Sequence, residues 1–322
     1  MIAPPGLSVV LATDAAATIS TTLRHLHAQG DPARIELVIA TLAGAVLHRD
    51  DPGLRDFPFV RIVHGDDGMN IARAEAQAVA AATAPWVVFA ESCAFPRPGF
   101  VDAMIGACQS DRWTVVGPAM RNRNPASDAS WAAMQINYGR WQDISGGGNR
   151  SRVPGHNSAY RRDALMALGP DLPDLMQSLT AVQDEIRTRG GLICFDPSAQ
   201  VEILNITGPG WYVIDQFGKG RQFARMRRRR WPVFRRLVYA AGMPLLPAVR
   251  LFRIVMGGGS TCRVRELARG HRCSLLVAGL VAGAAGECLG YLRGGPAGAG
   301  FFERNLHRSR YASGVHAQIQ TP

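Results

Sequence analysis

The first part of the chain alternates short apolar runs with segments in which apolar residues recur at helical spacing. The runs are of strand length and rich in Val, Ile, Leu, Phe and Ala, at 7–12, 35–40, 59–63, 86–90 and 113–117. The segments between them predict helices over 17–29, 70–83 and 99–108. Strands that alternate with helices in this way indicate an α/β fold with a doubly wound, mostly parallel sheet.

The pattern weakens after residue 120 and then resumes. Residues 121–152 are rich in Arg, Asn, Ser and Gly and predict a long mobile segment. Order is expected to return over 153–168, followed by a helix that ends at Arg189. Two further strands are expected near 192–195 and 199–204.

The character of the chain changes after Gly218. Residues 220–236 contain eight arginines interleaved with aromatic and apolar side chains, and two apolar stretches follow at 237–256 and 274–292. These features predict an α/β domain over 1–218 and a basic, apolar, helical extension over 219–322.

The two apolar stretches are interrupted by polar residues and proline. Pro244, Pro247, Arg250 and Arg253 break the first stretch, and Glu287 limits the second to residues 274–286. A membrane-spanning helix needs about 20 mostly apolar residues. The pattern therefore favours an interfacial or re-entrant element over a full span.

Composition excludes a disordered chain, since 47% of the 322 residues are hydrophobic and 19% are charged. The net charge of +11 is unevenly spread. Residues 1–216 hold 17 basic and 22 acidic residues, a balance of −5, whereas residues 217–322 hold 19 and 3, a balance of +16. The C-terminal region therefore predicts an anionic partner. A membrane surface and a nucleic acid both fit, and the neighbouring apolar stretches favour an anionic membrane.

The six cysteines are scattered and form no C-x-x-C pair. This spacing argues against a disulfide framework and the usual zinc sites, and it fits a reducing compartment. The first residues lack a basic region followed by an apolar run, so no cleaved secretory signal is expected.

Four acids lie at or just after the ends of predicted strands: Asp14, Asp66, Asp67 and Glu91. Ligands of open α/β sheets bind beyond the carboxyl ends of the strands. Glu91 follows the run WVVFA directly, where a carboxylate can hold a divalent cation that neutralises a leaving diphosphate. The alternative is a solvated loop acid or a partner of a helix N-terminus.

Five segments, in order, resemble those of the family 2 glycosyltransferases, which share the GT-A fold. They are LSVVLAT with the helix that follows it, GMNIARAEAQAVAAATAPWVVFAES, FPRPGFVDAM, VPGHNSAYRRDAL and RGGLICFDPSAQV. The resemblance covers about residues 7–230. The segment GECLGYL at 286–292 also resembles one that closes some bacterial, membrane-associated members.

The resemblance implies a role for several side chains. Glu91 corresponds to a ligand of Mg²⁺ or Mn²⁺. Residues expected to bind the nucleotide-sugar donor are Thr13, Asp14, Arg73, Arg221 and Arg225. Residues expected to bind the acceptor are His156, Asn157 and Arg161. The pair Arg161-Arg162 could hold either a phosphate or the adjoining loop. Arg73 could equally be a surface arginine, and His156 a turn histidine.

The chain departs from the family pattern at three places. Ala40 and Thr41 stand where an aspartate usually contacts the base, and Glu91-Ser92-Cys93 replaces Asp-x-Asp. No acid lies near Gln177, where the catalytic base is usual. The carboxylates expected to deprotonate the acceptor are therefore Asp184 or Glu185, with Asp174 as the next candidate.

The resemblance implies an inverting glycosyltransferase at the cytoplasmic face of the bacterial inner membrane. Such an enzyme would move a sugar from a nucleotide-diphosphate donor to a hydroxyl of a lipid-linked or polysaccharide acceptor. Two alternatives remain: a non-catalytic GT-A scaffold that serves as a binding partner, and a basic nucleic-acid-binding protein.

Overall fold

The structure, a computed structural model, describes residues 3–42, 45–65, 69–256 and 270–294, apart from the side chains of Arg229 and Arg230. The chain divides into two compact units. The first comprises Met1–Arg121 and Ile144–Ile203, and the second Asn122–Asp143 and Leu204–Pro322. The predicted domain boundary after residue 218 falls inside helix α8 (Pro209–Arg230) of the second unit.

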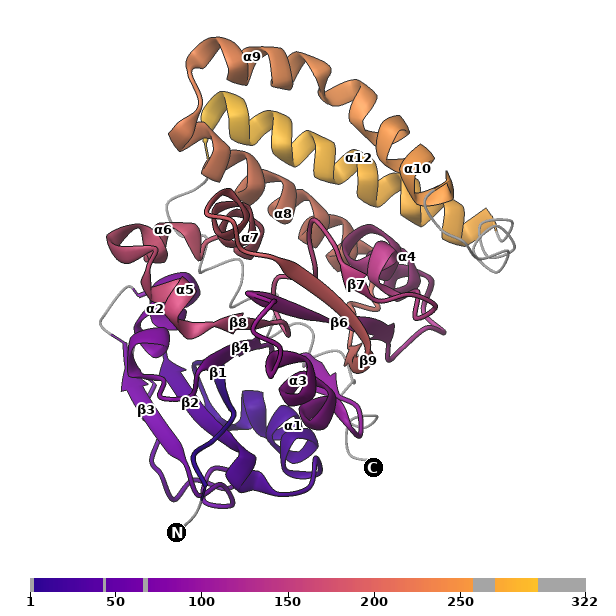
Figure 1. The fold of residues 1–322 in the computed structure, drawn as a ribbon. Helices are drawn as coiled ribbons and strands as arrows, with labels where there is room; N and C mark the ends of the chain where they lie inside the picture. Colours follow the sequence, from indigo (N-terminus) through magenta and orange to yellow (C-terminus); the bar gives the residue numbers. More distant parts are fainter. Residues whose placement is uncertain (1–2, 43–44, 66–68, 257–269, 295–322) are drawn as a thin grey trace. The chain divides into compact units, whose positions relative to one another are not determined.

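The first unit is built on a mixed sheet. Within the described residues its strands run in the order β3-β2-β1-β4-β8-β6-β9-β5, and β7 pairs with β9 (Figure 1). The strands are β1 (Leu7–Thr13), β2 (Ile35–Thr41), β3 (Val60–His64), β4 (Trp86–Ala90), β5 (Ala94–Pro96), β6 (Val115–Asn122), β7 (Gly148–Asn149), β8 (Ala159–Arg161) and β9 (Ile193–Ile203). The first four are parallel, and β8 pairs antiparallel with β4 and with β6. The predicted α/β class and the largely parallel first half are confirmed.

Six α-helices of the first unit connect these strands within the described residues. They are α1 (Ala16–His27), α2 (Ile71–Ala81), α3 (Phe100–Cys108), α5 (Arg162–Met166), α6 (Leu172–Leu175) and α7 (Leu179–Thr188). The chain passes from β1 through α1 to β2, and then returns from β3 through α2 to β4 on the other side of β1. Crossovers between parallel strands are nearly always right-handed, and these two run in opposite directions, so α1 and α2 are expected on opposite faces of the sheet. Figure 1 shows both helices beside these strands. The carboxyl ends of β1 and β4 thus form the topological switch point, where ligands of such sheets bind.

The middle strands are buried along nearly their whole length. All residues of β2 and β4 are buried, as are all but Ala12 in β1. Their runs of Val, Ile, Leu and Phe are typical of strands that helices cover on both faces. This burial explains why continuous apolar runs, and not alternating ones, mark these strands in the sequence.

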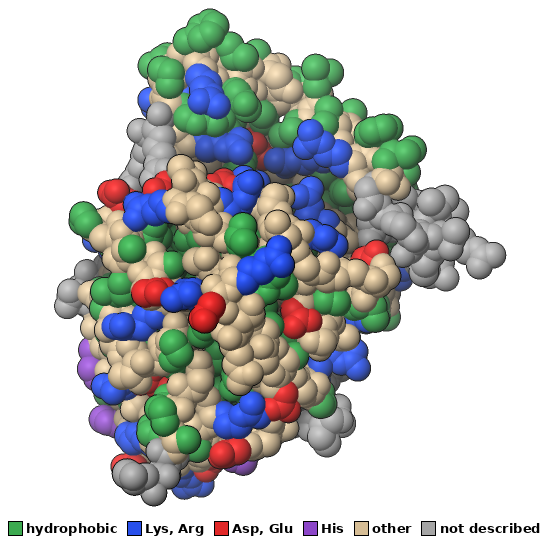
Figure 2. Space-filling view, in the orientation of Figure 1, with side chains coloured by type: hydrophobic (Ala, Val, Ile, Leu, Met, Phe, Trp, Pro, Cys, Tyr) green, Lys and Arg blue, Asp and Glu red, His purple; other side chains and the backbone are tan. Residues whose placement is uncertain are grey.

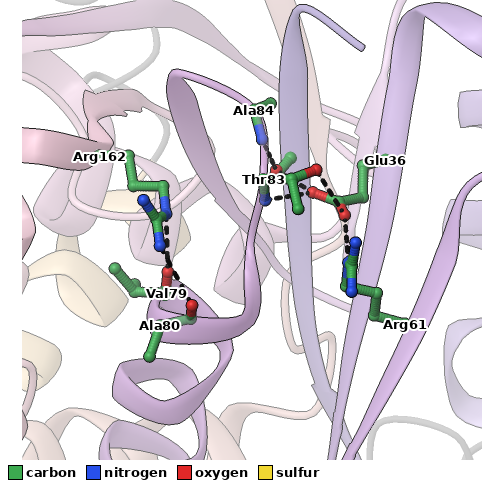
Figure 3. Close-up of polar contacts among 8 residues, drawn as sticks. Glu36, Arg61, Val79, Ala80, Thr83, Ala84 and Arg162 are labelled. Atoms are coloured by element: carbon green, nitrogen blue, oxygen red, sulfur yellow. Dashed lines mark hydrogen bonds and ion pairs between the residues drawn. The ribbon is translucent and has the colours of Figure 1, made fainter. Parts of the chain in front are cut away.

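Glu36 is a buried acid in the middle of this apolar region (Figure 3). Its carboxylate accepts hydrogen bonds from the Ser8 hydroxyl, from the backbone N–H and hydroxyl of Thr83 at 2.7 and 2.9 Å, and from Arg61 Nε at 2.7 Å. Burial alone would raise the pKa of Glu36, but these donors outweigh it and lower the pKa below its ordinary value. The carboxylate therefore links β1, β2 and β3 to the residues that lead into β4.

Two predictions about the middle of the chain are wrong. Residues 121–152 contain helix α4 (Asp128–Tyr138), which begins with the Ser127 side chain accepting a hydrogen bond from Ser130 N. Its apolar side is buried by other parts of the second unit, so distant residues stabilise a helix that local composition does not indicate. The two strands expected near 192–195 and 199–204 are one strand, β9, which continues through Pro197.

The second unit consists of α4 and the C-terminal helices α8, α9 (Val233–Gly242), α10 (Leu246–Met256) and α12 (Gly270–Arg293). Helix α12 packs along α8 through glycines. A β-carbon on Gly220 of α8 would lie 2.1 Å from the carbonyl oxygen of Gly283, and one on Gly286 would lie 2.1 Å from that of Phe217. Only residues without a side chain allow two helix backbones to approach this closely.

Two helical segments in the described part of the chain are long and apolar enough to cross a membrane. They are Val233–Met256, which joins α9 to α10 through the 3₁₀ turn η4 (Met243–Leu245), and Gly270–Arg293. Each has 24 residues, and 11% of the first segment's apolar window and 50% of the second's are buried within the protein. By length and composition both segments could therefore cross a membrane. The first contains Pro244, Pro247, Arg250 and Arg253, and the second contains Glu287.

The Glu36 interactions predict a pH-dependent contribution to stability. Replacing Glu36 by Gln should lower the free energy of unfolding at neutral pH by about 2 kcal/mol, because hydrogen bonds to a charged group are lost. Since the pKa of Glu36 is lowered in the folded protein, its contribution is complete above the ordinary value of 4.5 and disappears as the pH falls through the folded value. Urea unfolding at neutral and acidic pH tests this, and an unchanged difference between the two proteins at both pH values would contradict it.

The glycine contact predicts a second effect on stability. Gly286→Ala should destabilise the second unit by about 2 kcal/mol, because the added methyl group meets a backbone carbonyl that cannot move independently. Gly210→Ala on α8 is the matched control, since its β-carbon would meet nothing within 4 Å. Thermal unfolding of both variants should show a loss for Gly286→Ala alone, and equal midpoints would exclude close packing of the two helices.

Candidate functional site

Thr13 ends β1 at the switch point, and Asp14 follows it in the turn into α1. The buried Thr13 hydroxyl donates to the carbonyl oxygen of Ala15 at 2.8 Å and accepts from the Ala15 N–H at 3.2 Å. Asp14 Oδ1 accepts from the Thr18 hydroxyl at 3.4 Å, one helical turn later. Thr13 therefore shapes the turn, while Asp14 lies at the rim beside the beginning of α1.

Glu91 emerges directly after β4, as the sequence predicts, and Asn157 orients it. Asn157 Nδ2 donates to Glu91 Oε2 at 3.0 Å, and the Asn157 backbone N–H donates to the carbonyl oxygen of Phe89 at 2.6 Å. Asn157 has a φ of 64°, a left-handed conformation that asparagine adopts more readily than most residues. Two residues expected on different sides of the site, the metal ligand and an acceptor-side asparagine, are thus in direct contact.

His156 lies between two glutamates. Its Nε2 is 3.3 Å from Glu75 Oε1, and its Nδ1 is 4.0 Å from Glu91 Oε1. The Glu75 side chain is 3% exposed and belongs to α2. Sequence reasoning missed Glu75, although an acid on the alanine-rich, buried side of a helix was a detectable signal.

Gln183 is a second residue that the sequence did not reveal. Its side chain is buried and hydrogen-bonds to the backbone of Val153 and Pro154 and, at 2.9 Å, to the Tyr160 hydroxyl. These contacts fix both ends of the segment that carries His156 and Asn157. Gln183 on α7 is therefore a positioning residue for the rim of the sheet.

The two expected bases lie next to Gln183 on α7, and each forms an ion pair. Asp184 accepts two close hydrogen bonds from Arg152 Nη2, at 2.9 and 2.6 Å, and Glu185 accepts one from Arg189 Nε at 2.9 Å. Asp174 accepts from the Gln177 side chain at 3.1 Å. Both predicted carboxylates are thus half-buried acids that already contact an arginine.

The arginine pair Arg161-Arg162 contacts the neighbouring chain segments. Arg161 pairs with Asp163 at 2.8 Å and lowers the pKa of that carboxyl group. Arg162 donates to the carbonyl oxygens of Val79 and Ala80 at the end of α2, at 3.2 and 3.1 Å (Figure 3). Cations stabilise helix C-termini in this way, so the structure supports loop holding as the role of Arg162.

The other expected donor-binding residues lie on helices. Arg73 is exposed in the first turn of α2, where its N–H donates to the capping side chain of Asn70 at 2.9 Å. Arg221 and Arg225 belong to α8 of the second unit, in which Arg221 Nε donates to the carbonyl oxygen of Gly294 at 3.1 Å. Asp66 and Asp67 lie outside the described residues.

The described residues offer limited ligands for a divalent cation. They contain no group of three or more His, Cys, Asp or Glu side chains arranged to hold a metal ion. Cys93, at the third position of the Glu91-Ser92-Cys93 segment, is buried and is a poor ligand for a hard cation. Glu91 fits Mg²⁺ or Mn²⁺ as a single carboxylate ligand, provided that substrate phosphates and water complete the coordination.

Comparison with known proteins gives a match in fold but none in sequence. No protein-family model and no curated protein sequence matches the chain. One similar solved structure is GalNAc-T7 with UDP, GalNAc and Mn²⁺, at 12% identity and a TM-score of 0.46. It is matched over 62% of this chain, which spans only 43% of that one.

A second similar structure is the mannosyltransferase PcManGT from Pyrobaculum calidifontis in complex with GDP-Man and Mn²⁺. Its TM-score is 0.55 at 16% identity, over 88% of this chain and 87% of that one. A match of this extent, together with the order and direction of the strands, shows the architecture. The chain has the GT-A fold of glycosyltransferases.

Proposed function

We propose that the protein is a glycosyltransferase that moves a sugar from a nucleotide-diphosphate donor to an acceptor hydroxyl. The observation that carries this proposal is the placement of Glu91 at the switch point of a GT-A sheet, oriented by Asn157 and flanked by His156. The complex of PcManGT with GDP-Man and Mn²⁺ supports a nucleotide-sugar donor and a divalent cation.

Glu91 is the residue proposed to hold the cation, which when bound would neutralise charge on the departing diphosphate. Because the described residues contribute one carboxylate to this proposed site, we expect most of the remaining ligands to come from the donor and from water. Metal binding and nucleotide binding should therefore depend strongly on each other.

The donor and the acceptor are proposed to lie on the two sides of Glu91. Thr13, Asp14 and Arg73 are the donor-binding candidates of the first unit. Arg221 and Arg225, on α8 of the second unit, are donor-binding candidates from the sequence resemblance alone. The acceptor side would be formed by His156, Asn157 and Arg161. The segment from Val153 to Tyr160, which Gln183 holds in place, would keep His156 and Asn157 in position during the reaction.

Asp184 or Glu185 is proposed to accept the proton of the acceptor hydroxyl, so that the oxygen attacks the anomeric carbon with inversion. Arg152 Nη2 donates to both oxygens of the Asp184 carboxylate, so the acceptor hydroxyl would have to displace or share this contact before Asp184 could take its proton. The acceptor is proposed to be lipid-linked or a polysaccharide, used at the cytoplasmic face of a bacterial inner membrane.

One alternative has direct support from the site. A GT-A scaffold that binds nucleotide without transferring sugar would explain why both acids of α7 are paired with arginines and why no metal-binding group of three appears in the described residues. An assay of sugar transfer separates the two functions, because a scaffold would show no transfer with any nucleotide-sugar donor.

Glu91→Gln should abolish the effect of Mn²⁺ on nucleotide binding. In the unaltered protein, a nucleoside diphosphate and Mn²⁺ together should raise the unfolding temperature by more than the sum of their separate effects. The variant should lose this excess, because the neutral amide is a much weaker ligand for a hard cation. Asp102→Asn, at an exposed acid of α3, is the control, and an excess that survives in Glu91→Gln would rule out Glu91 as the ligand.

Removing the base should slow sugar transfer while leaving donor binding unchanged. Asp184→Asn or Glu185→Gln should lower kcat by at least about 100-fold, the lower range for loss of a general base. Arg152→Gln breaks the ion pair with Asp184 but keeps the Asp184 carboxylate. If Asp184 has only a structural role, Arg152→Gln and Asp184→Asn should therefore lower kcat equally. Near-normal turnover in both acid variants would place the base elsewhere, and no turnover in the unaltered protein would favour the scaffold.

A further inference from the structure

The segment Val233–Met256 presents an exposed apolar stripe along its whole length. Its large exposed side chains are Val233, Phe234, Leu237, Val238, Tyr239, Leu245, Val249, Phe252 and Met256. Phe234 and Val238 lie four residues apart on α9, and Val249, Phe252 and Met256 lie three and four apart on α10, so each set lies on one side of its own helix. Phe234 is 78% exposed and Phe252 is 63% exposed. Figure 2 shows hydrophobic side chains spread over the surface of these helices.

The opposite side of the same segment packs inside the second unit. Ala240 and Met243 are buried in a cluster with Ala224 of α8 and Tyr291 of α12. Leu251 and Ile254 pack against a second cluster that includes Tyr212, Leu276 and Leu280. The stripe is therefore the outward side of a helix layer whose inward side is already satisfied.

The charges around the stripe are of one sign. Arg235 and Arg253 are exposed on the same two helices, and the Arg235 guanidinium lies 4.2 Å from the centre of the Trp231 ring. Between residues 204 and 294, the described residues include only two acids, Asp215 and Glu287. Both are buried and paired, with Lys219 and Arg250 respectively. A surface that combines exposed apolar and cationic side chains and lacks exposed acids complements an anionic lipid leaflet.

Two arginines of the basic stretch 220–236 have partners within the second unit. Arg227 donates to the Tyr291 hydroxyl at 3.3 Å and stacks on Phe223, with its guanidinium carbon 4.0 Å from the ring centre. Arg228 donates to the carbonyl oxygen of Leu292 at 2.8 Å, near the end of α12. Replacing the run 227–230 would therefore disturb the fold as well as any lipid contact.

The packing of α12 argues against a transmembrane orientation. Helix α12 contacts α8 from Gly279, opposite Tyr212, to Gly290, opposite Ala224. A bilayer that enclosed α12 would also enclose the middle of α8, which carries Lys219, Arg221 and Arg225. Such charges are costly in a hydrocarbon core. Val233–Met256 carries four arginines of its own, at 235, 236, 250 and 253.

We propose that α9, η4 and α10 form a monotopic membrane-binding surface that lies in the plane of an anionic leaflet. The apolar stripe inserts among the acyl chains, Arg235 and Arg253 contact lipid phosphates, and α12 supports this layer from inside the protein. The proposal is independent of sugar transfer, because it concerns lipid binding by the second unit alone.

Flotation of the full-length protein with lipid vesicles tests this surface. The protein should float with vesicles of equal parts phosphatidylcholine and phosphatidylglycerol, and less with phosphatidylcholine alone. Phe234→Asp with Phe252→Asp should weaken binding by at least about tenfold, since two large apolar side chains no longer insert. Arg235→Gln with Arg253→Gln should weaken binding to the anionic vesicles by about fivefold per arginine at low salt, with little effect on neutral ones.

The matched control changes two exposed apolar residues of the first unit. Val46→Asp with Ile144→Asp, at side chains 73% and 46% exposed, should bind vesicles like the unaltered protein. Thermal unfolding checks that every variant folds. The proposal would be overturned if the protein floated with neither vesicle, or if the Phe234→Asp with Phe252→Asp variant bound vesicles as well as the unaltered protein. It would also be overturned if detergent, but not alkaline carbonate, extracted the protein from membranes, because that behaviour indicates a membrane-spanning helix. Salt-sensitive binding to single-stranded nucleic acid without flotation would favour a nucleic-acid partner instead.

Discussion

The burial of β4 between β1 and β8 is the constraint on which the candidate site depends. Every residue of this strand is buried, and its partners fix its register on both sides. The chain must therefore leave the sheet with Glu91 at the rim, at the point where the direction of strand order reverses. The last strand carbonyls still need donors, and Asn157 N–H supplies one to Phe89. The same backbone contact that satisfies β4 brings the Asn157 side chain to Glu91.

The sequence predicts the buried strands around β4, but it does not predict contacts between segments that lie far apart in the chain. The strands β1, β2 and β4 are continuous apolar runs, and a strand-end acid such as Glu91 follows from topology alone. The position of Glu75 on the apolar side of α2 could mark it as buried, but the partners of Glu75 and Gln183 depend on which distant segment folds against them, so no local pattern indicates those partners. Helix α4 shows the same limit, since its apolar side is defined only by the C-terminal helices that bury it. The pairing of Asp184 with Arg152 likewise joins residues far apart in the sequence.

The charge composition predicted a basic C-terminal region, but it did not predict which contacts each arginine makes. A count of arginines cannot distinguish Arg228, which stabilises the end of α12, from Arg235, which is exposed beside the apolar stripe. Both lie in one short stretch, and their difference arises from helical phase and from what packs on each side. On the described parts of these C-terminal helices, the acids Asp215 and Glu287 are buried and paired with Lys219 and Arg250, so the charged side chains that remain at the surface of these helices are cationic.

The exposed apolar stripe is a consequence of how the second unit packs. Helix α12 presents its glycines to α8, and this close approach commits one side of each helix to the other. Helices α9 and α10 can then pack only as an outer layer, with Ala240 and Met243 turned inward. Large side chains such as Phe234 and Phe252 remain on the outer side, where exposure to water is unfavourable. Soluble monomers rarely retain contiguous apolar surface of this kind without a partner. On the described parts of these helices the flanking arginines have no exposed acid beside them, so the surface suits a partner that is both apolar and anionic, as the proposed lipid leaflet is.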